Sequence, residues 1–204
     1  GLAMVKVGFI VEGESEKLVV ESPMFQQWLH DHDCTLVTPV IDAKGGGNLL
    51  PQHIEPFIQR LSHAGVERIV VLTDLEDEAH PDLVRQRVAH PRIQCIFVAV
   101  KALEAWFLAD SQAMNAWLKI DDFHEPQPEA TPDKPWERLK QIASEHGKRG
   151  PGASKVAFTQ KLLKHWGFSI ARAAQHAACP SAKELADYFR AAALTPPPSL
   201  PPPP

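Results

Sequence analysis

Residues 5–16 read Val5-Lys6-Val7-Gly8-Phe9-Ile10-Val11-Glu12-Gly13-Glu14-Ser15-Glu16, so that an apolar run ends directly in a cluster of acids. The same pattern returns further along the chain, where Ile69-Val70-Val71-Leu72-Thr73 is followed by Asp74-Leu75-Glu76-Asp77-Glu78. Short apolar runs rich in β-branched residues and bounded by polar clusters are typical of buried parallel strands. The two stretches therefore predict two strands of a parallel sheet.

Both acidic clusters are expected at the carboxyl ends of their strands, which is the edge where open α/β sheets bind ligands. If the two strands are neighbours, their carboxylates converge on one spot. Several carboxylates without cationic partners repel one another unless a hard cation lies among them, and Mg²⁺ is the usual one. The sequence therefore predicts a site for Mg²⁺, or for Mn²⁺ in its place, on a parallel sheet.

Length and composition suit an ordinary globular protein. The chain has 204 residues and a hydrophobic content of 44%, which fits one domain or one domain with a small helical lobe. No apolar run approaches the length of a bilayer span, and the N-terminus lacks the pattern of a secretion signal, so we expect no membrane partner. Cys34, Cys95 and Cys179 are scattered and lack a C-x-x-C spacing, which indicates a protein of the reducing cytoplasm.

The first hundred residues alternate between strand and helix patterns. Strands are expected at residues 5–11, 35–41, 68–74 and 93–100, and helices at 15–30, 48–64 and 81–89, with Asn48 as an N-cap. Such a series implies a mostly parallel sheet with right-handed crossovers. We therefore expect an α/β fold with about four strands flanked by helices.

The character of the sequence changes after the fourth predicted strand. Residues 121–135 hold four prolines and predict a linker or long loop. It separates an α/β domain at 4–120 from a C-terminal helical lobe at 136–194, in which Ser181 and Glu184 match a capping box. Residues 195–204 are mostly proline and predict an extended tail.

Charge is distributed unevenly along the chain. Residues 1–125 carry 10 Lys and Arg against 19 Asp and Glu, whereas residues 126–190 carry 11 against 6. The basic half includes the segment 148–155, which reads Lys148-Arg149-Gly150-Pro151-Gly152-Ala153-Ser154-Lys155. This segment either holds a nucleic-acid backbone or is a solvated loop, since both carry such charge.

The acidic motifs resemble those of known families. Val11-Glu12-Gly13-Glu14-Ser15-Glu16 resembles the first motif of Toprim domains, especially those of the overcoming-lysogenization-defect (OLD) nucleases, and Asp74-Leu75-Glu76 lies where Toprim domains have Asp-x-Asp. Together with Leu103-Glu104-Ala105-Trp106-Phe107-Leu108-Ala109-Asp110 and Cys179-Pro180-Ser181, they resemble the Toprim-related domain of unknown function 4276. That likeness covers most of residues 5–190 and implies a Toprim-like fold.

The resemblance also implies roles for individual residues. Glu12 takes the place of the general acid/base or metal ligand, and Asp74 with Glu76 takes the place of the Mg²⁺-binding pair. Glu16 matches the second acid that the OLD nucleases add to the first motif. Because Glu76 is one methylene longer than the usual Asp, Asp77 is an alternative ligand.

Three further candidates lie outside the two acidic clusters. Glu104 follows the fourth predicted strand and either completes the metal shell or is a surface residue near Lys101. The loop Lys44-Gly45-Gly46-Gly47 precedes a predicted helix and either offers N–H groups and the Lys44 ammonium to a phosphate or is a plain crossover. Lys155 is the favoured catalytic cation of the basic segment.

Two main functions remain open at this level, beside a nucleotide-binding module that only the loop Gly45–Gly47 supports. The first is a metal-dependent phosphodiester or phosphoryl-transfer enzyme that cleaves nucleic acid. The second is a catalytically degenerate Toprim module that acts as partner or regulator of another protein, such as an ATPase. The intact Glu12 and Asp74 favour the first, whereas the long Glu76 and the acidic net charge favour the second.

Overall fold

The computed structural model describes residues 3–194, so the proline-rich tail predicted for residues 195–204 lies outside the described residues. One sheet contains five strands, which are β1 (Val5–Val11), β2 (Cys34–Leu36), β3 (Ile41–Asp42), β4 (Arg68–Asp74) and β5 (Ile93–Ala99). All pairings are parallel and the strand order is β2-β1-β4-β5, with β3 also paired to β1. The predicted α/β fold with a mostly parallel sheet is confirmed.

Two predicted elements are interrupted at a proline. The strand expected at residues 35–41 is divided into β2 and β3, which pair with opposite ends of β1, and Pro39 between them has no N–H to donate to a ladder. The helix expected at residues 15–30 is divided into α1 (Glu14–Glu21) and α2 (Pro23–Asp31). Ser22 caps α2 by accepting a hydrogen bond from the Phe25 N–H at 3.4 Å.

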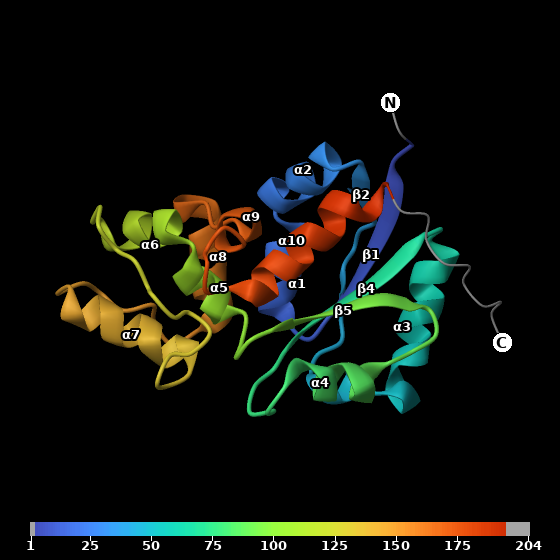
Figure 1. Ribbon diagram of the computed structural model, residues 1–204, viewed down its shortest axis with the longest axis horizontal. Helices are drawn as coiled ribbons and strands as arrows, with labels where there is room; N and C mark the ends of the chain where they lie inside the picture. The colour runs from blue at the N-terminus through green and yellow to red at the C-terminus, as the bar shows by residue number, and fades with distance from the viewer. Residues whose placement is uncertain (1–2, 195–204) are drawn as a thin grey trace.

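Helices cover both faces of the sheet (Figure 1). Side chains alternate along each strand, so that Val7 and Phe9 pack with α1, α2 and α10 (Pro180–Ala192), whereas Ile10 packs with α3 (Pro51–His63) and α4 (Pro81–Val88). At Gly8 in β1, a Cβ would lie 2.9 Å from side-chain atoms of Leu61 and Val66. A glycine in this strand therefore lets α3 approach the sheet closely.

The connection into α3 differs from the prediction. A 3₁₀ turn, η1 (Gly46–Leu49), follows β3, and α3 begins only at Pro51. The expected cap by Asn48 is therefore wrong. The Asn48 side chain instead donates to the Ala43 carbonyl at 2.8 Å, which closes the glycine-rich loop on itself.

The remaining helices lie beyond the carboxyl ends of the strands (Figure 1). They are α5 (Glu104–Ala109), α6 (Ser111–Leu118), α7 (Pro135–Glu145), α8 (Lys155–Trp166) and α9 (Ile170–Ala173). One hydrophobic cluster runs from Phe9 in the sheet through Phe107 in α5 to Phe158 in α8. The division into a domain, a linker and a lobe stays a prediction. Among the described residues, no helix has the length and apolarity needed to cross a membrane.

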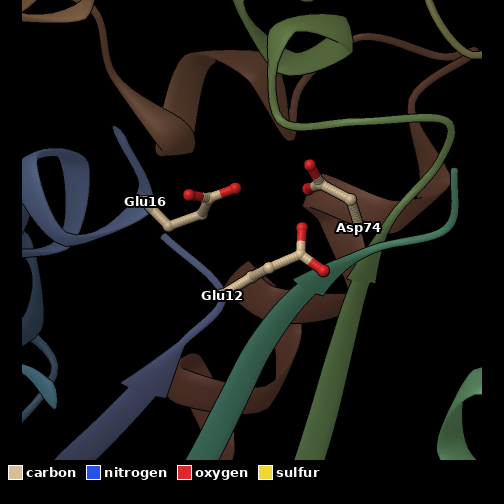
Figure 2. Close-up of side chains that lie close together, drawn as sticks. All are labelled: Glu12, Glu16 and Asp74. Carbon is tan, nitrogen blue, oxygen red and sulfur yellow. The ribbon is translucent and has the colours of Figure 1, made fainter. Parts of the chain in front are cut away.

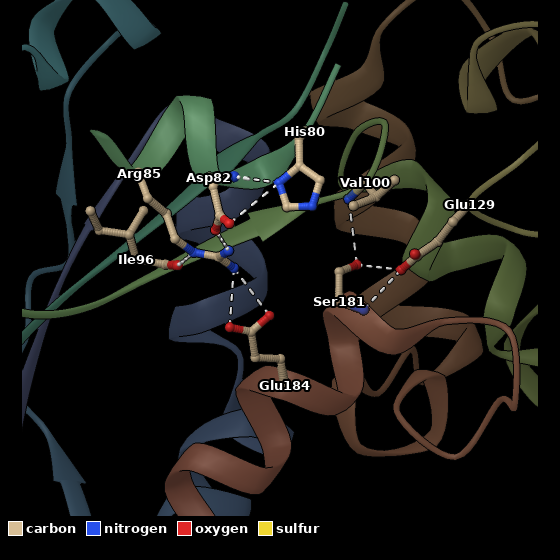
Figure 3. Close-up of polar contacts among 8 residues, drawn as sticks. All are labelled: His80, Asp82, Arg85, Ile96, Val100, Glu129, Ser181 and Glu184. Carbon is tan, nitrogen blue, oxygen red and sulfur yellow. Dashed lines mark hydrogen bonds and ion pairs between the residues drawn. The ribbon is translucent and has the colours of Figure 1, made fainter. Parts of the chain in front are cut away.

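Helix α10 returns from the helical side to the sheet and is fixed there by polar contacts (Figure 3). Glu184 receives two hydrogen bonds from Arg85 of α4, both at 3.1 Å. The Ser181 hydroxyl donates to Glu129 and accepts from the Trp106 indole N–H at 2.8 Å. The capping box predicted for Ser181 and Glu184 is therefore wrong, because both side chains serve contacts between elements.

Candidate metal centre

The two acidic motifs end adjacent strands. β1 and β4 are paired from Val7 to Val11, and the Glu12 N–H extends the ladder by donating to the Leu72 carbonyl at 3.1 Å. The chain leaves β1 toward β2 and leaves β4 toward β5, so the strand order reverses between them. Such a switch point opens a crevice at the carboxyl edge, which is where open α/β sheets bind ligands.

Three carboxylates from three positions meet in this crevice. Glu12 follows β1, Glu16 lies in the first turn of α1, and Asp74 ends β4. One carboxylate oxygen of each lies within 4.8 Å of the others, and the three side chains point toward a common space (Figure 2). The extended backbone of Gly13, the N-cap of α1, turns the chain between the first two.

Neighbouring groups orient these side chains. The Thr73 hydroxyl donates to Glu12 Oε1 at 2.9 Å, and the Leu103 N–H donates to Asp74 Oδ1 at 3.1 Å. On the other side of Glu12, a Cβ at Gly46 would lie only 2.8 Å from Glu12 Oε1. The Glu12 carboxylate is therefore held between β4 and the glycine-rich loop.

The three carboxylates have little cationic compensation, although the charge of Arg87 acts to lower the pKa of Glu12. Within residues 3–194, none of them forms an ion pair. Burial raises the pKa of Glu16 to about 7, and Glu12 and Glu104 add repulsion. Burial also raises the pKa of Asp74 well above its usual range, and the charges of Glu16 and Glu12 raise it further. The pKa of Glu12 is also raised by burial, although the Thr73 hydroxyl opposes this shift.

This donor set fits a hard divalent cation. Carboxylate oxygens are the protein ligands that Mg²⁺ and Mn²⁺ prefer, and a cation among three crowded carboxylates removes their repulsion. The residues that would hold it are Glu12, Glu16 and Asp74. Sequence reasoning named all three, although the role of Glu16 came from the resemblance alone.

The other predicted acidic ligands lie around this group. Glu104 is only 7% exposed and close enough to raise the pKa of both Asp74 and Glu16. Glu76 and Asp77 are exposed beyond the end of β4, and Glu76 has a left-handed backbone with a φ of 53°. The structure thus brings Glu104 near the three carboxylates. Glu76 is exposed, but its charge is also close enough to raise the pKa of Glu12 and Asp74.

The predicted basic and glycine residues also reach the site. Lys155, the first residue of α8, places its Nζ 3.6 Å from Glu104 Oε1. Gly46 and Gly47 line a cavity together with Glu12 and Asp74. Lys44 is exposed, and neither Lys44 nor Gly45, whose φ is 126°, lines that cavity.

Sequence reasoning missed two contributors. Thr73 is a buried hydroxyl in an otherwise apolar strand, and a buried hydroxyl needs a partner. The need for a partner could have indicated that the Thr73 hydroxyl forms a hydrogen bond with a neighbouring polar side chain such as Glu12. Lys134 lines a cavity beside Asp74, but it lies in a proline-rich stretch whose pattern indicates only a linker.

Comparisons with known proteins give a family and no activity. Neither the curated proteins nor the solved structures contain a match to the chain. A family model described as "Domain of unknown function (DUF4276)" matches residues 11–189 and thus spans both acidic motifs. The chain belongs to the DUF4276 family.

Proposed function

We propose that the chain is a Mg²⁺- or Mn²⁺-dependent phosphoryl-transfer protein that cleaves phosphodiester bonds of nucleic acids. The observation that carries this proposal is the convergence of Glu12, Glu16 and Asp74 within 4.8 Å at the switch point of a parallel sheet. Buried carboxylates without cations cost stability. Such a group is retained when it serves a ligand, and a divalent cation fits best.

Each residue has a role in this proposal. Glu16 and Asp74 hold the ion, which supplies Lewis-acid polarisation of a phosphate and neutralises its charge. Glu12 is either the general base or a ligand of a second ion. The hydrogen bond from Thr73 fixes the orientation of the Glu12 carboxylate. The raised pKa of Glu12 favours proton transfer nearer neutral pH. Lys155 contacts a phosphate oxygen of the substrate.

We also propose a relationship to Toprim domains. Support comes from the place of the motifs in the fold, because Glu12 follows β1 and Asp74 ends β4, its neighbour in the sheet. Glu16 contributes a second acid from the same motif, as in OLD nucleases. The proposed relationship predicts the same division of labour between Glu12 and the acids of β4.

One observation favours a second function. Glu76 is exposed and is not among the three acids whose carboxylate oxygens lie within 4.8 Å of one another, so the second acid of the Asp-x-Asp pattern lies outside this group. A degenerate module that binds a partner protein such as an ATPase would tolerate this arrangement. It predicts metal binding without turnover, or no metal binding, and a stable complex with the partner.

Calorimetric titration of Mg²⁺ and Mn²⁺ tests the first function. Asp74→Asn removes one charge and keeps an oxygen that can accept the Leu103 N–H bond, so the variant should fold and lose metal binding. Glu14→Gln is the matched control, since Glu14 is exposed in the same turn of α1 as Glu16. Equal binding by Asp74→Asn and the wild type would refute the metal site.

Cleavage assays on DNA and RNA then test the activity. The wild type and Glu14→Gln should cleave in the presence of Mg²⁺ or Mn²⁺, whereas Asp74→Asn and Glu12→Gln should not. Metal-dependent cleavage that persists in both of the latter variants would overturn the assignment. Metal binding without cleavage of any nucleic acid would favour the regulatory module.

A further inference from the structure

Asp74, Glu76 and Asp77, at and beyond the end of β4, line two cavities. One cavity is also lined by residues that follow β5 and the other by Glu12, which follows β1, so the two extend toward the two strands that flank β4. The first, which we call the lysine pocket, has a volume of about 410 Å³ and is also lined by Lys101, Lys134 and Lys155. The second, which we call the glycine pocket, has a volume of about 480 Å³ and is also lined by Gly46, Gly47 and Arg87. Of the three candidate ligands, Asp74 therefore lines both pockets, whereas Glu12 lines only the glycine pocket.

The two pockets differ in charge. Apart from the shared acids, the lysine pocket has three cations against two carboxylates, Glu104 and Asp133. The glycine pocket has one cation, Arg87, against Glu12 and Glu78. Arg87 is ion-paired with Glu78 at 2.5 Å. Only the lysine pocket therefore offers cations to an anionic group.

The three lysines are not equally available. The Lys101 ammonium donates to the backbone carbonyls of Thr131 and Asp133, which fixes the wall of the pocket. Lys155 is more than half exposed, and its 3.6 Å distance to Glu104 exceeds that of a hydrogen bond. Lys134 is exposed and, within residues 3–194, forms no ion pair. Lys134 and Lys155 are thus the cations that a ligand can engage.

The wall that carries Lys134 is held in place. Glu129, in the same loop, accepts hydrogen bonds from the Ser181 hydroxyl and from its N–H, the latter at 2.9 Å (Figure 3). Trp136, directly after the loop, is buried beneath the pocket. Lys134 is therefore presented from a supported segment, which lowers the entropic cost of binding a phosphate there.

This asymmetry restricts the substrate. A polynucleotide that continued past the carboxylates in both directions would place phosphates in both pockets, and the glycine pocket would repel them. A nucleotide unit that ends in a phosphate places its charge in the lysine pocket alone. On the basis of the proposed function, we propose that the site recognises a terminal phosphate of a nucleotide unit, held by Lys134 and Lys155.

Fluorescence anisotropy with single strands that differ only at their ends tests this proposal. Ca²⁺ replaces Mg²⁺ so that the strands stay intact. A strand with a terminal phosphate should bind about tenfold more tightly than the same strand with hydroxyl ends, as expected for one charge-assisted contact. Lys134→Gln and Lys155→Gln should each reduce this preference, whereas Lys161→Gln, at an exposed lysine of α8 outside the pocket, should keep it.

Competition with a nucleoside monophosphate identifies the source of the phosphate. If the free nucleotide displaces the phosphorylated strand at similar concentrations, the ligand is a nucleotide, and if it does not, the ligand is a strand end. Equal binding of phosphorylated, hydroxyl-ended and circular strands would overturn the inference. Calorimetric metal binding by the lysine variants keeps this test separate from the proposed function, which Asp74→Asn tests alone.

Discussion

Two buried carboxylate sites differ in how their charge is compensated. Asp110, between α5 and α6, is fully buried and lies beside Arg172, which approaches it through Nε at 2.9 Å and Nη2 at 3.1 Å. Asp110 also accepts the N–H groups of Ala113 and Ser169, at 3.2 and 3.0 Å. Glu16, which is also buried, has Glu12 and Asp74 as its neighbours.

The contrast separates structure from function. Asp110 caps α6, joins it to the start of α9 and has a cation, so its contacts explain its presence without a ligand. At the other site, Glu12 raises the pKa of Glu16, and both Glu12 and Glu16 raise the pKa of Asp74. Burial of an acid therefore does not by itself indicate a functional site. The charge of the neighbouring side chains does, because a cation explains a structural acid and further acids indicate a missing ligand.

The largest expected effect comes from breaking the compensated site. Arg172→Met leaves Asp110 buried without its cation, and loss of one partner of a buried pair typically costs about 3–5 kcal/mol. We expect a loss of unfolding free energy of this size in urea denaturation at neutral pH. Lys183→Met, which removes the exposed pair with Asp187 on α10, is the control and should leave the midpoint unchanged. Similar losses in both variants would contradict the contrast.

A change of the opposite sign is expected at the uncompensated site. The pKa of Glu16 is about 7 in the folded chain against an ordinary value of 4.5. Between these values the folded state holds a proton that the unfolded state has released, so the unfolding free energy falls as the pH rises. Glu16→Gln removes this penalty. The variant should be more stable than the wild type at pH 8 without metal, by up to about 3 kcal/mol.

Thermal unfolding at two pH values measures the effect. Well below pH 4.5, Glu16 is protonated in both states, so Glu16→Gln should match the wild type. At pH 8, Mg²⁺ should stabilise the wild type by mass action and leave Glu16→Gln nearly unchanged. Glu14→Gln should follow the wild type throughout. A Glu16→Gln variant that is less stable than the wild type at pH 8 would show that Glu16 is compensated.

Sequence patterns predicted this contrast only in part. The apolar runs before Glu12 and Asp74 fixed two strands, and the rule that parallel strands share a carboxyl edge brought the two acids together. The pattern does not give the order of the strands in the sheet. The convergence of the two acids therefore depended on the assumption that their strands are neighbours. Glu16 required the resemblance, since an acid in the first turn of a helix is ordinarily explained by the helix dipole.

Contacts between distant segments were beyond such patterns. Nothing in the sequence joins Asp110 to Arg172, which lies 62 positions later, or the Lys134 loop to the end of β4. Prolines at positions 23 and 39 did carry a signal, because each interrupts the element predicted across it. Glu76 shows another limit, since nothing in its motif predicts the left-handed backbone that it adopts after β4.

The smallest expected effect concerns the position of one carboxylate of the acidic group, that of Glu12. A Cβ at Gly46 would lie 2.8 Å from Glu12 Oε1, whereas a Cβ at the neighbouring Gly47 would meet nothing within 4 Å. Gly46→Ala should therefore displace Glu12 from its bond with Thr73, and we expect metal affinity to fall about tenfold, or about 1.4 kcal/mol. Gly47→Ala should keep the affinity of the wild type.

Stability should respond differently from affinity in this pair. The atom that must move is the end of a flexible side chain, and Gly→Ala lowers the entropy of the unfolded chain. Both variants should therefore unfold within about 1 kcal/mol of the wild type, as measured in urea. A Gly46→Ala variant with unchanged calorimetric affinity would show that the position of Glu12 does not matter to the ion. Glu16 and Asp74 would then hold it alone, and Glu12 would be left with the role of general base.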